Sequence, residues 1–213
     1  MRYPFSLSVY NAYYQEPRFR PSIAQLEMVN AGRLGRKSGR GFFDYSQNAK
    51  RPSPRGEAVK PESIGLAGFE LGQQVTIEGV QVGLTDGRMA REVAGACGTP
   101  VLLYDWSRAN TPARTGFATS PGVPGAFIDR FVRTLQDRGR SAVRLPDWPG
   151  LVVMRTVAMV VNEAFEAVLQ GVATEEGVGA AMMYGVNYPK GPFDWARQIG
   201  LDRMLAVIDN LNR

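Results

Sequence analysis

A proline- and cation-rich stretch at residues 46–74 most constrains how this chain of 213 residues can fold. It contains Pro52 and Pro54 close together among lysine and arginine residues. Proline ends a helix and removes a donor from a sheet, so neither element is expected to run through this stretch. The sequence therefore predicts a domain boundary here, with residues 51–74 as a linker that follows a first segment, residues 1–50.

The first segment has the pattern of two short helices. Tyr10, Tyr13 and Tyr14 lie at helical spacing before Pro17, and a second apolar stripe ends near Ala31. Helical spacing of apolar residues indicates one face turned toward a core. We therefore expect these tyrosines to belong to a core rather than to a surface that stacks on a ligand.

A basic, glycine-rich loop follows at residues 31–45, where four glycines alternate with four cations before an aromatic-rich tail. The spacing alone favours a helix end, which Gly32 caps and whose negative terminus the cations complement. The alternative is an anion site, because glycines turn backbone amides outward and clustered cations attract phosphate or carboxylate. Its candidate ligands are Arg33, Arg36, Lys37 and Arg40.

Residues 75–146 alternate between strand and helix patterns. Strand material is expected at 75–77, 80–84, 101–104 and 141–145, with a turn near Gly79. Helical stripes are expected around 89–97 and 128–135, and a polar loop between about 106 and 124. Strands that alternate with helices indicate a small parallel α/β unit.

This unit is not expected to bind a dinucleotide. Asp105 ends a strand where a ribose-binding carboxylate would lie. However, the turn from Gly83 to Gly87 lacks the three-glycine fingerprint, and Asp86 would repel phosphates. We therefore predict that Asp105 is a turn or capping residue.

Residues 147–213 read as a series of helices. A helix over about 149–170 is apolar nearly all round, which indicates burial on most faces, and Asp147 is its expected N-cap. Thr174 is expected to cap a shorter helix. A rigid turn around Pro192 then leads into another helix that Gly200 stops, and Asp202 is expected to cap the last one.

Composition excludes several classes of function. The chain has no histidine, which excludes a Ser-His-Asp or Cys-His site and any histidine-ligated metal. No metal site is expected. Cys97 is the only cysteine, so no internal disulfide forms, and this suits the cytoplasm. No apolar run approaches the ~20 residues of a membrane span, no signal peptide opens the sequence, and no membrane partner is expected.

The net charge of +5 and a pI of about 9.6 favour anionic partners in general. They raise the alternative of a nucleic-acid binder. No known motif places the cations of the basic loop on an element that reads a groove, so we predict no nucleic-acid partner.

Both ends of the chain resemble one family. The stretch Ala31–Tyr45, preceded by Glu16–Pro21, resembles the close of the helical C-terminal domain of 3-hydroxyacyl-CoA dehydrogenases. Residues 75–145 look like the reduced Rossmann-type insert between two such domains in longer bacterial members, including those of aromatic-acid catabolism. Five stretches resemble the opening of the same helical domain: Pro149–Leu151, Asn162–Ala164, Gly171–Thr174, Gly185–Phe193 and Gly200–Asp202.

The resemblance implies a mainly α fold with a small α/β insert. Helical segments similar to the C-terminal domain of 6-phosphogluconate dehydrogenase would flank a reduced Rossmann-like unit. Residues 1–50 would be the second half of one helical domain, 51–74 a linker, 75–146 the α/β unit, and 147–213 the first half of a second helical domain.

The same resemblance implies NAD-dependent oxidation of a 3-hydroxyacyl-CoA to the 3-ketoacyl-CoA by a longer parent enzyme. The NAD domain and the catalytic histidine–glutamate pair of the family would lie before Met1, so this fragment is expected to be inactive and to bind no cofactor. The family uses an asparagine just before an arginine in the opening helix. Here Met154 precedes Arg155, and a thioether cannot donate the hydrogen bond of an amide.

The fragment is therefore expected to serve dimerisation and the shaping of the substrate cleft. Its two half-domains would pack together within one chain or by exchange of helices between two chains. The alternative is a pure oligomerisation module that binds no ligand. The candidate substrate-binding residues are Arg33, Arg36, Lys37, Arg40, Pro192 and Phe193.

Overall fold

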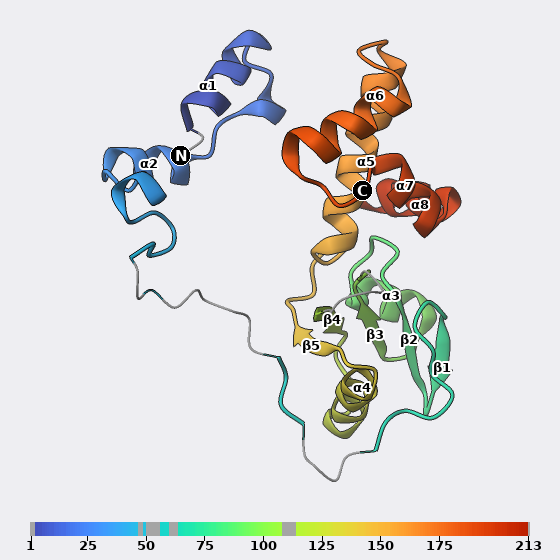
Figure 1. Cartoon of the computed structure of the whole chain (residues 1–213). Coiled ribbons are helices and arrows are strands. Elements are labelled where there is room, and N and C mark those ends of the chain that lie inside the picture. The colour runs from blue at the N-terminus through green and yellow to red at the C-terminus, as the bar shows by residue number, and fades with distance from the viewer. Residues whose placement is uncertain (1–2, 47–48, 50–55, 60–63, 108–113, 213) are drawn as a thin grey trace. The chain divides into compact units, whose positions relative to one another are not determined.

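The computed structural model describes residues 3–46, 49, 56–59, 64–107 and 114–212 (Figure 1). The chain divides into two compact units, Met1–Pro54 and Arg55–Arg213. We call them the N-terminal unit and the C-terminal unit. Among the described residues, no helix is both long and apolar enough to cross a membrane.

The N-terminal unit holds two helices, α1 (Tyr3–Ala12) and α2 (Ile23–Asn30), and two short 3₁₀ turns, η1 (Pro17–Phe19) and η2 (Arg36–Ser38). α1 ends before Pro17 because Tyr14 and Gln15 take positive φ. The expected aromatic core is wrong for this chain: Tyr14 is 97% exposed. Among the residues of this unit whose burial is described, Gly41 alone is buried, so the unit has too little interior to cover its aromatic side chains.

The C-terminal unit begins with a five-stranded sheet in the order β1-β2-β3-β4-β5. The strands are β1 (Val75–Ile77), β2 (Val80–Leu84), β3 (Val101–Tyr104), β4 (Arg114–Thr119) and β5 (Ser141–Arg144). β1 and β2 form a hairpin with its turn at Gly79, as predicted, and Gly79 takes positive φ there. β2 and β3 are parallel, β4 and β5 are parallel, and β3 and β4 are antiparallel.

The expectation of a parallel sheet and of a polar loop up to residue 124 is therefore wrong. β4 lies within the stretch expected to be a loop, and it runs antiparallel to β3. Thr115 and Phe117 are buried on one face of β4, and Ala118 is buried on the other. Threonine has a polar side chain but is common in strands. Its presence weakened the hydrophobic pattern by which β4 would have been predicted.

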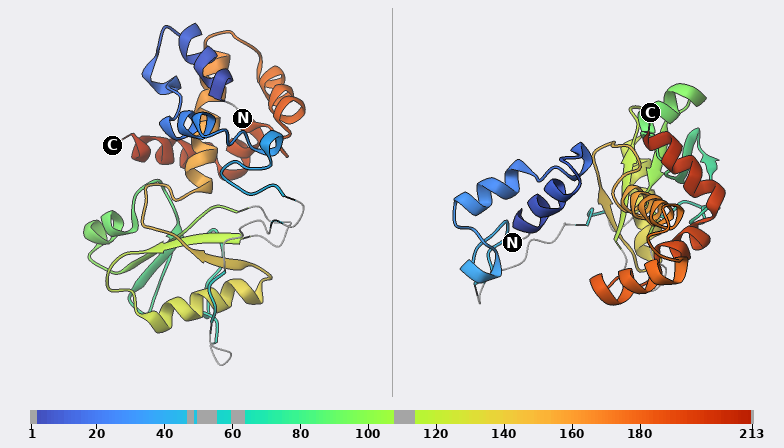
Figure 2. Two further views of the ribbon diagram at one scale, coloured as in Figure 1. Left: turned by 90° about the vertical axis from the view of Figure 1, so that its left-hand side faces the viewer. Right: turned by 90° about the horizontal axis from the view of Figure 1, so that it is seen from above.

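Two helices cover opposite faces of the sheet (Figures 1 and 2). Leu102 and Tyr104 of β3 pack in the same core as α4 (Gly125–Asp137), whereas Val101 and Leu103 pack with α3 (Ala90–Cys97). This alternation follows from the two-residue period of a strand. Each half of the sheet is thus a strand–helix–strand crossover.

The expected linker over 51–74 is shorter than predicted. Leu66 and Phe69 are buried in the core beneath α4, and the Leu66 N–H donates to Thr134 Oγ1 at 2.7 Å. Residues 64–74 therefore belong to the C-terminal unit. The remainder of the expected linker lies partly outside the described residues, at 51–55 and 60–63.

The rest of the C-terminal unit is helical: α5 (Val153–Leu169), α6 (Glu175–Ala180), the π-helical turn η3 (Ala181–Gly185), α7 (Pro192–Ile199) and α8 (Leu201–Leu211). Thr174 caps α6 as predicted, accepting from the Gly177 N–H at 3.2 Å. Asp202 lies in the first turn of α8, whose N-cap is Gly200, so its expected capping role is wrong. The helices meet over a core made of Met154, Val157, Ala158, Val161, Trp195, Ala196, Met204 and Val207.

These observations establish a helical protein with a five-stranded mixed α/β portion, which is the coarse form of the predicted fold class.

Candidate functional sites

Asp105 at the end of β3 caps α5. Its carboxylate accepts the backbone N–H groups of Val152 (3.0 Å), Val153 (2.7 Å) and Met154 (2.8 Å), and the side chain is 2% exposed. Burial raises the pKa of Asp105, and the backbone donors oppose that shift. The predicted capping role is confirmed, and the carboxylate is committed to three donors at one helix terminus.

Asp147 caps a different helix from the expected one. It accepts the N–H groups of Ala90 at 2.6 Å and Arg91 at 3.0 Å, at the start of α3. The predicted cap on α5 is therefore wrong. The N–H groups at the start of α5 donate to Asp105 instead, a residue far away in the sequence. Two carboxylates thus fasten helices to the sheet portion, one at α5 and one at α3.

The turn after β2 is covered by α8. Asn210 Nδ2 of α8 donates to the Asp86 carbonyl at 2.9 Å. Gly87 has a φ of +101°, and a Cβ atom there would lie 2.7 Å from the Val207 carbonyl. The Asp86 carboxylate binds Arg88 through Nε at 2.9 Å and Nη2 at 2.5 Å. In a dinucleotide-binding fold, this turn approaches the pyrophosphate; here it approaches a helix.

The basic loop is held in shape by its glycines and by Ser38. Ser38 Oγ accepts the Leu34 N–H at 2.8 Å and donates to the Arg40 carbonyl at 2.9 Å. The Gly35 N–H also donates to the Arg40 carbonyl, at 2.9 Å. A Cβ atom at Gly41 would lie 2.9 Å from Gly35 Cα, so two backbone segments cross where only glycine fits.

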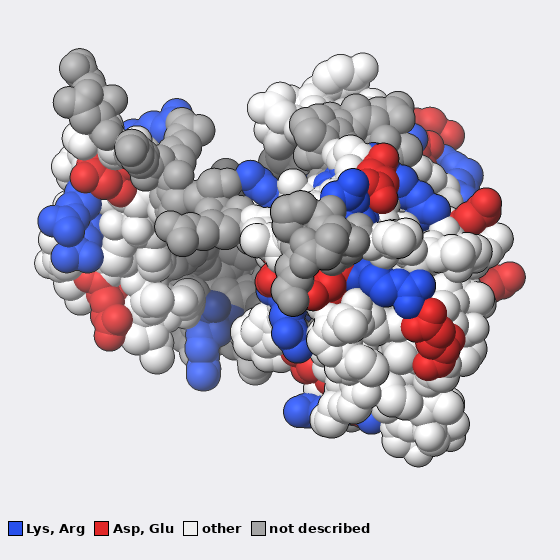
Figure 3. All heavy atoms as spheres, turned by 90° about the horizontal axis from the view of Figure 1, so that it is seen from below, with Lys and Arg blue, Asp and Glu red and all other residues white. Residues whose placement is uncertain are grey.

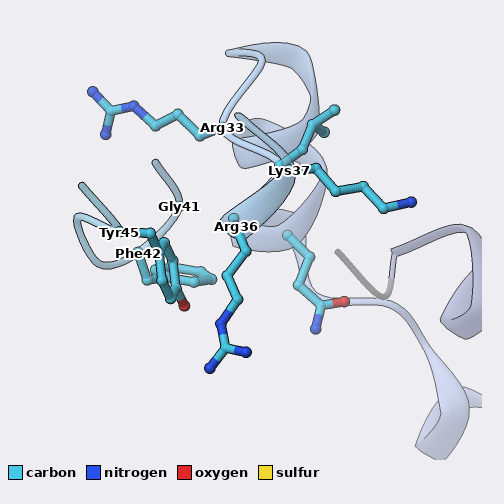
Figure 4. A pocket seen from close by; sticks show the side chains of 9 residues that line it. Arg33, Arg36, Lys37, Gly41, Phe42 and Tyr45 are labelled. Atoms are coloured by element: carbon cyan, nitrogen blue, oxygen red, sulfur yellow. The ribbon is translucent and has the colours of Figure 1, made fainter. Parts of the chain in front are cut away.

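Three of the four predicted cations line one pocket, which we call the basic pocket. It has a volume of about 690 Å³ and is lined by Gln25, Arg33, Leu34, Gly35, Arg36, Lys37, Gly41, Phe42 and Tyr45. Figure 4 shows that the charged ends of Arg33, Arg36 and Lys37 point in different directions, with Arg36 beside Tyr45 and Phe42. The Arg36 guanidinium carbon lies 6.0 Å from the centre of the Tyr45 ring, within range of a cation–π contact.

Arg40, the fourth predicted cation, is not among the lining residues. Its strand-like pairing joins it to Asp44. The Ser46 hydrogen bonds lower the pKa of Asp44, and the charge of Arg40 lowers it further. The turn at Gly39 therefore separates Arg40 from the cations that the sequence placed beside it.

Gln25 of α2 is a lining residue that sequence reasoning missed. Its Oε1 atom is buried, and no donor among the described residues reaches it. The residue precedes the basic loop in another element, and nothing in the local pattern of α2 distinguishes it. The aromatic tail of the loop was a usable signal for Phe42 and Tyr45, since it lies directly beside the cations.

The other two predicted site residues, Pro192 and Phe193, lie in the C-terminal unit at the start of α7. Both are buried. The Phe193 ring packs edge-to-face on Phe165 of α5, with ring centres 5.0 Å apart. Only a small part of Phe193 therefore faces a surface pocket of about 420 Å³ that it shares with Glu175, Tyr184 and Arg197.

Cationic and acidic side chains are intermixed on the face of the C-terminal unit seen in Figure 3. That face does not offer the continuous basic stripe typical of a nucleic-acid interface. Among the described residues, no group of three or more Cys, Asp or Glu side chains is placed to hold a metal ion.

Comparison with known proteins identifies relatives for almost the whole chain. A family model described as 3-hydroxyacyl-CoA dehydrogenase, C-terminal domain, matches residues 3–45 and 150–213. The 3-hydroxyadipyl-CoA dehydrogenase of Escherichia coli (strain K12) is 36% identical over 213 residues, which are 99% of this chain and 44% of that protein. A probable 3-hydroxybutyryl-CoA dehydrogenase of Deinococcus radiodurans is 29% identical over 151 residues, 68% of this chain and 53% of that protein.

A solved structure is also similar. The crystal structure of 3-hydroxybutyryl-CoA dehydrogenase from Escherichia coli K12 matches with a TM-score of 0.87 at 34% identity, covering 98% of this chain and 44% of that one. The chain thus spans about half the length of these relatives.

Proposed function

The chain belongs to the family of 3-hydroxyacyl-CoA dehydrogenase C-terminal domains, and on this premise we propose that it is the C-terminal portion of an NAD-dependent 3-hydroxyacyl-CoA dehydrogenase. The parent enzyme would oxidise the 3-hydroxyl group of an acyl-CoA to a ketone and transfer the hydride to NAD. The observation that carries this proposal is the family match at both ends of the chain, at 3–45 and 150–213. The single cysteine of the chain, Cys97, is free and exposed. A free thiol suits a cytoplasmic enzyme of acyl-CoA or aromatic-acid breakdown.

We also propose the domain organisation that the resemblance implies. The N-terminal unit would be the second half of one helical domain of the 6-phosphogluconate-dehydrogenase type, and residues 147–213 the first half of another. Residues 75–146 would be a reduced Rossmann-like unit. The contacts of Asp105, Asp147 and Asn210 support a unit whose role is to position helices.

The fragment itself is proposed to be catalytically inactive. It has no histidine to act as a base. In its α/β portion, the carboxylate at the end of β3 is committed to α5, and α8 covers the turn after β2. Met154, at the position of the family's asparagine, is fully buried in the helical core.

We expect residues 1–213 to give no saturable heat when NADH is titrated in a calorimeter, and no oxidation of NADH with acetoacetyl-CoA. The physical reason is the contact between α8 and the Gly87 turn, which leaves no room for a pyrophosphate. The control is a dinucleotide-dependent dehydrogenase in the same buffer. Saturable NADH binding that persists after Arg36→Ala in the basic pocket would contradict the proposal and make the α/β portion a nucleotide domain.

The fragment is proposed to contribute assembly. A largely apolar groove of about 340 Å³ lies between α5 and α8, lined by Val161, Phe165, Leu201 and Leu205 among others. Phe165, Leu201 and Leu205 are 43%, 56% and 60% exposed, and the N-terminal unit exposes Phe5 at 70%. Apolar faces of this kind favour packing of the two half-domains on each other, within one chain or between two.

We expect a homodimer in sedimentation velocity at micromolar concentration, because the exposed apolar faces gain most when two copies associate. Leu205→Glu should shift the equilibrium toward monomer by at least tenfold, while Ala96→Glu on α3, an exposed site that does not line the groove, should not. A monomer whose α1 and α2 amides exchange freely with solvent would contradict the proposal.

A role in shaping the substrate cleft is proposed for Arg33, Arg36 and Lys37, which line the basic pocket, and for the turn at Pro192 and Phe193. The second candidate function, an oligomerisation module without a ligand, is favoured by one observation. Phe193 is 4% exposed and packs on Phe165, so it has little surface left for a substrate.

A further inference from the structure

We propose that the basic pocket of the N-terminal unit binds an adenosine nucleotide that carries two separated phosphoryl groups, with the 3′-phosphoadenosine end of coenzyme A as the ligand. The choice of coenzyme A rests on the proposed function. The class of ligand rests on the pocket itself.

The charge of the pocket indicates an anion. Three of its described lining residues are cationic and none is acidic. Neighbouring cations repel each other when no counter-charge is present, and guanidinium groups match phosphate oxygens in a bidentate geometry. An anion bound in the pocket would relieve that repulsion.

The directions of the cations indicate more than one phosphoryl group. Their charged ends diverge around the pocket instead of meeting at one point (Figure 4). A single small anion would contact one of them. A nucleotide phosphorylated at both the 3′ and the 5′ positions presents charge on two sides of its ribose and would contact more than one.

The remaining lining residues indicate a base. Phe42 and Tyr45 are 68% and 39% exposed and offer aromatic faces, on which a nucleobase stacks. Gln25 Oε1 is a buried acceptor that no described donor reaches. A buried acceptor without a partner is unfavourable, and an amino group of adenine would supply its missing donor. Inorganic phosphate has neither the ring nor that donor.

The size of the pocket fits such a ligand. Its volume of about 690 Å³ lies within the ~300–1,000 Å³ that is usual for small-molecule sites. Gly35 lines it without a side chain, and a Cβ atom there would meet nothing within 4 Å, so a ligand approaches the backbone at that position. Ser38 holds the loop in this shape before any ligand arrives.

The test is a calorimetric titration of adenosine 3′,5′-bisphosphate into residues 1–213 at low salt. We expect saturable binding that Arg36→Ala weakens at least tenfold and Tyr45→Leu at least fivefold. The matched control is Arg40→Ala, which removes the same charge from the same loop outside the pocket and should change the affinity less than twofold. Lys37→Met replaces Arg36→Ala if thermal unfolding shows that the latter is misfolded.

Inorganic pyrophosphate and a single-stranded oligonucleotide serve as competing probes. Equal affinity for pyrophosphate would overturn the nucleotide assignment, and a tighter oligonucleotide complex would replace it with a nucleic-acid site. Equal losses of affinity in Arg40→Ala and Arg36→Ala, or no binding of adenosine 3′,5′-bisphosphate at all, would overturn the assignment of the basic pocket as the binding site. Sedimentation without ligand tests the assembly proposal, and the titration tests this inference. A negative result in one measurement therefore does not decide the other.

Discussion

Asp105→Ala is expected to lower the free energy of unfolding of the C-terminal unit by about 2–4 kcal/mol. The substitution removes the single carboxylate that satisfies three backbone N–H groups at the start of α5. Loss of a helix cap costs about 0.5–2 kcal/mol, and buried donors left without a partner add a further ~1–3 kcal/mol. Denaturant unfolding followed by circular dichroism, with an unchanged m-value, measures the effect.

Asp147→Ala is the matched control, because it removes the other helix-capping carboxylate. Asp147 caps α3 with two donors and is half-buried. Its loss is expected to cost about 1 kcal/mol. If the two alanine variants were equally stable, Asp105 would not be the dominant attachment between the sheet and α5.

The raised pKa of Asp105 gives this prediction a pH dependence. Between the ordinary value near 3.8 and the higher pKa in the folded protein, the folded state holds more protons than the unfolded state. The contribution of Asp105 to stability is therefore present in full below the unfolded pKa and declines as the pH rises through the folded pKa. The difference in stability between the wild type and Asp105→Asn should decline over that window, and a rise would contradict the assigned direction.

Features encoded over a few residues could be predicted from the sequence. Thr174 caps the helix that begins beside it, and Gly79 makes the turn between adjacent strands. Arg33, Arg36 and Lys37 line one pocket because they lie within five positions of each other. In each case the groups are neighbours along the chain, so their closeness follows from the sequence, whereas anion binding by Arg33, Arg36 and Lys37 stays a prediction.

Features that depend on distant segments could not be predicted. Asp105 reaches α5 across 47–49 positions, and Asp147 reaches α3 across 56–57. The sequence shows that an aspartate can cap a helix. Which helix each aspartate caps depends on how the sheet brings distant segments together. Gln25 lines the basic pocket although it belongs to α2, outside the loop. The turn at Gly39 places Arg40 outside the pocket. β4 was missed because its buried face includes a threonine.

Gly87→Ala is expected to destabilise the C-terminal unit by about 2–4 kcal/mol, the second large effect. Glycine alone adopts a φ of +101° without strain, and a residue with a Cβ there costs about 1–3 kcal/mol. The added Cβ would also lie 2.7 Å from the Val207 carbonyl, which belongs to the backbone of α8 and cannot rotate away. α8 must therefore shift, which weakens the 2.9 Å hydrogen bond from Asn210 to the Asp86 carbonyl.

Gly95→Ala is the matched control for this substitution. Gly95 lies inside α3, and a Cβ there meets nothing within 4 Å. Replacing a helical glycine with alanine stabilises by roughly 0.5–1 kcal/mol, so the two glycines should respond with opposite signs. The pair also distinguishes the two roles open to Gly87: a residue that makes room for a bound nucleotide would lose NADH affinity on substitution, whereas a residue that makes room for α8 loses stability with no ligand present.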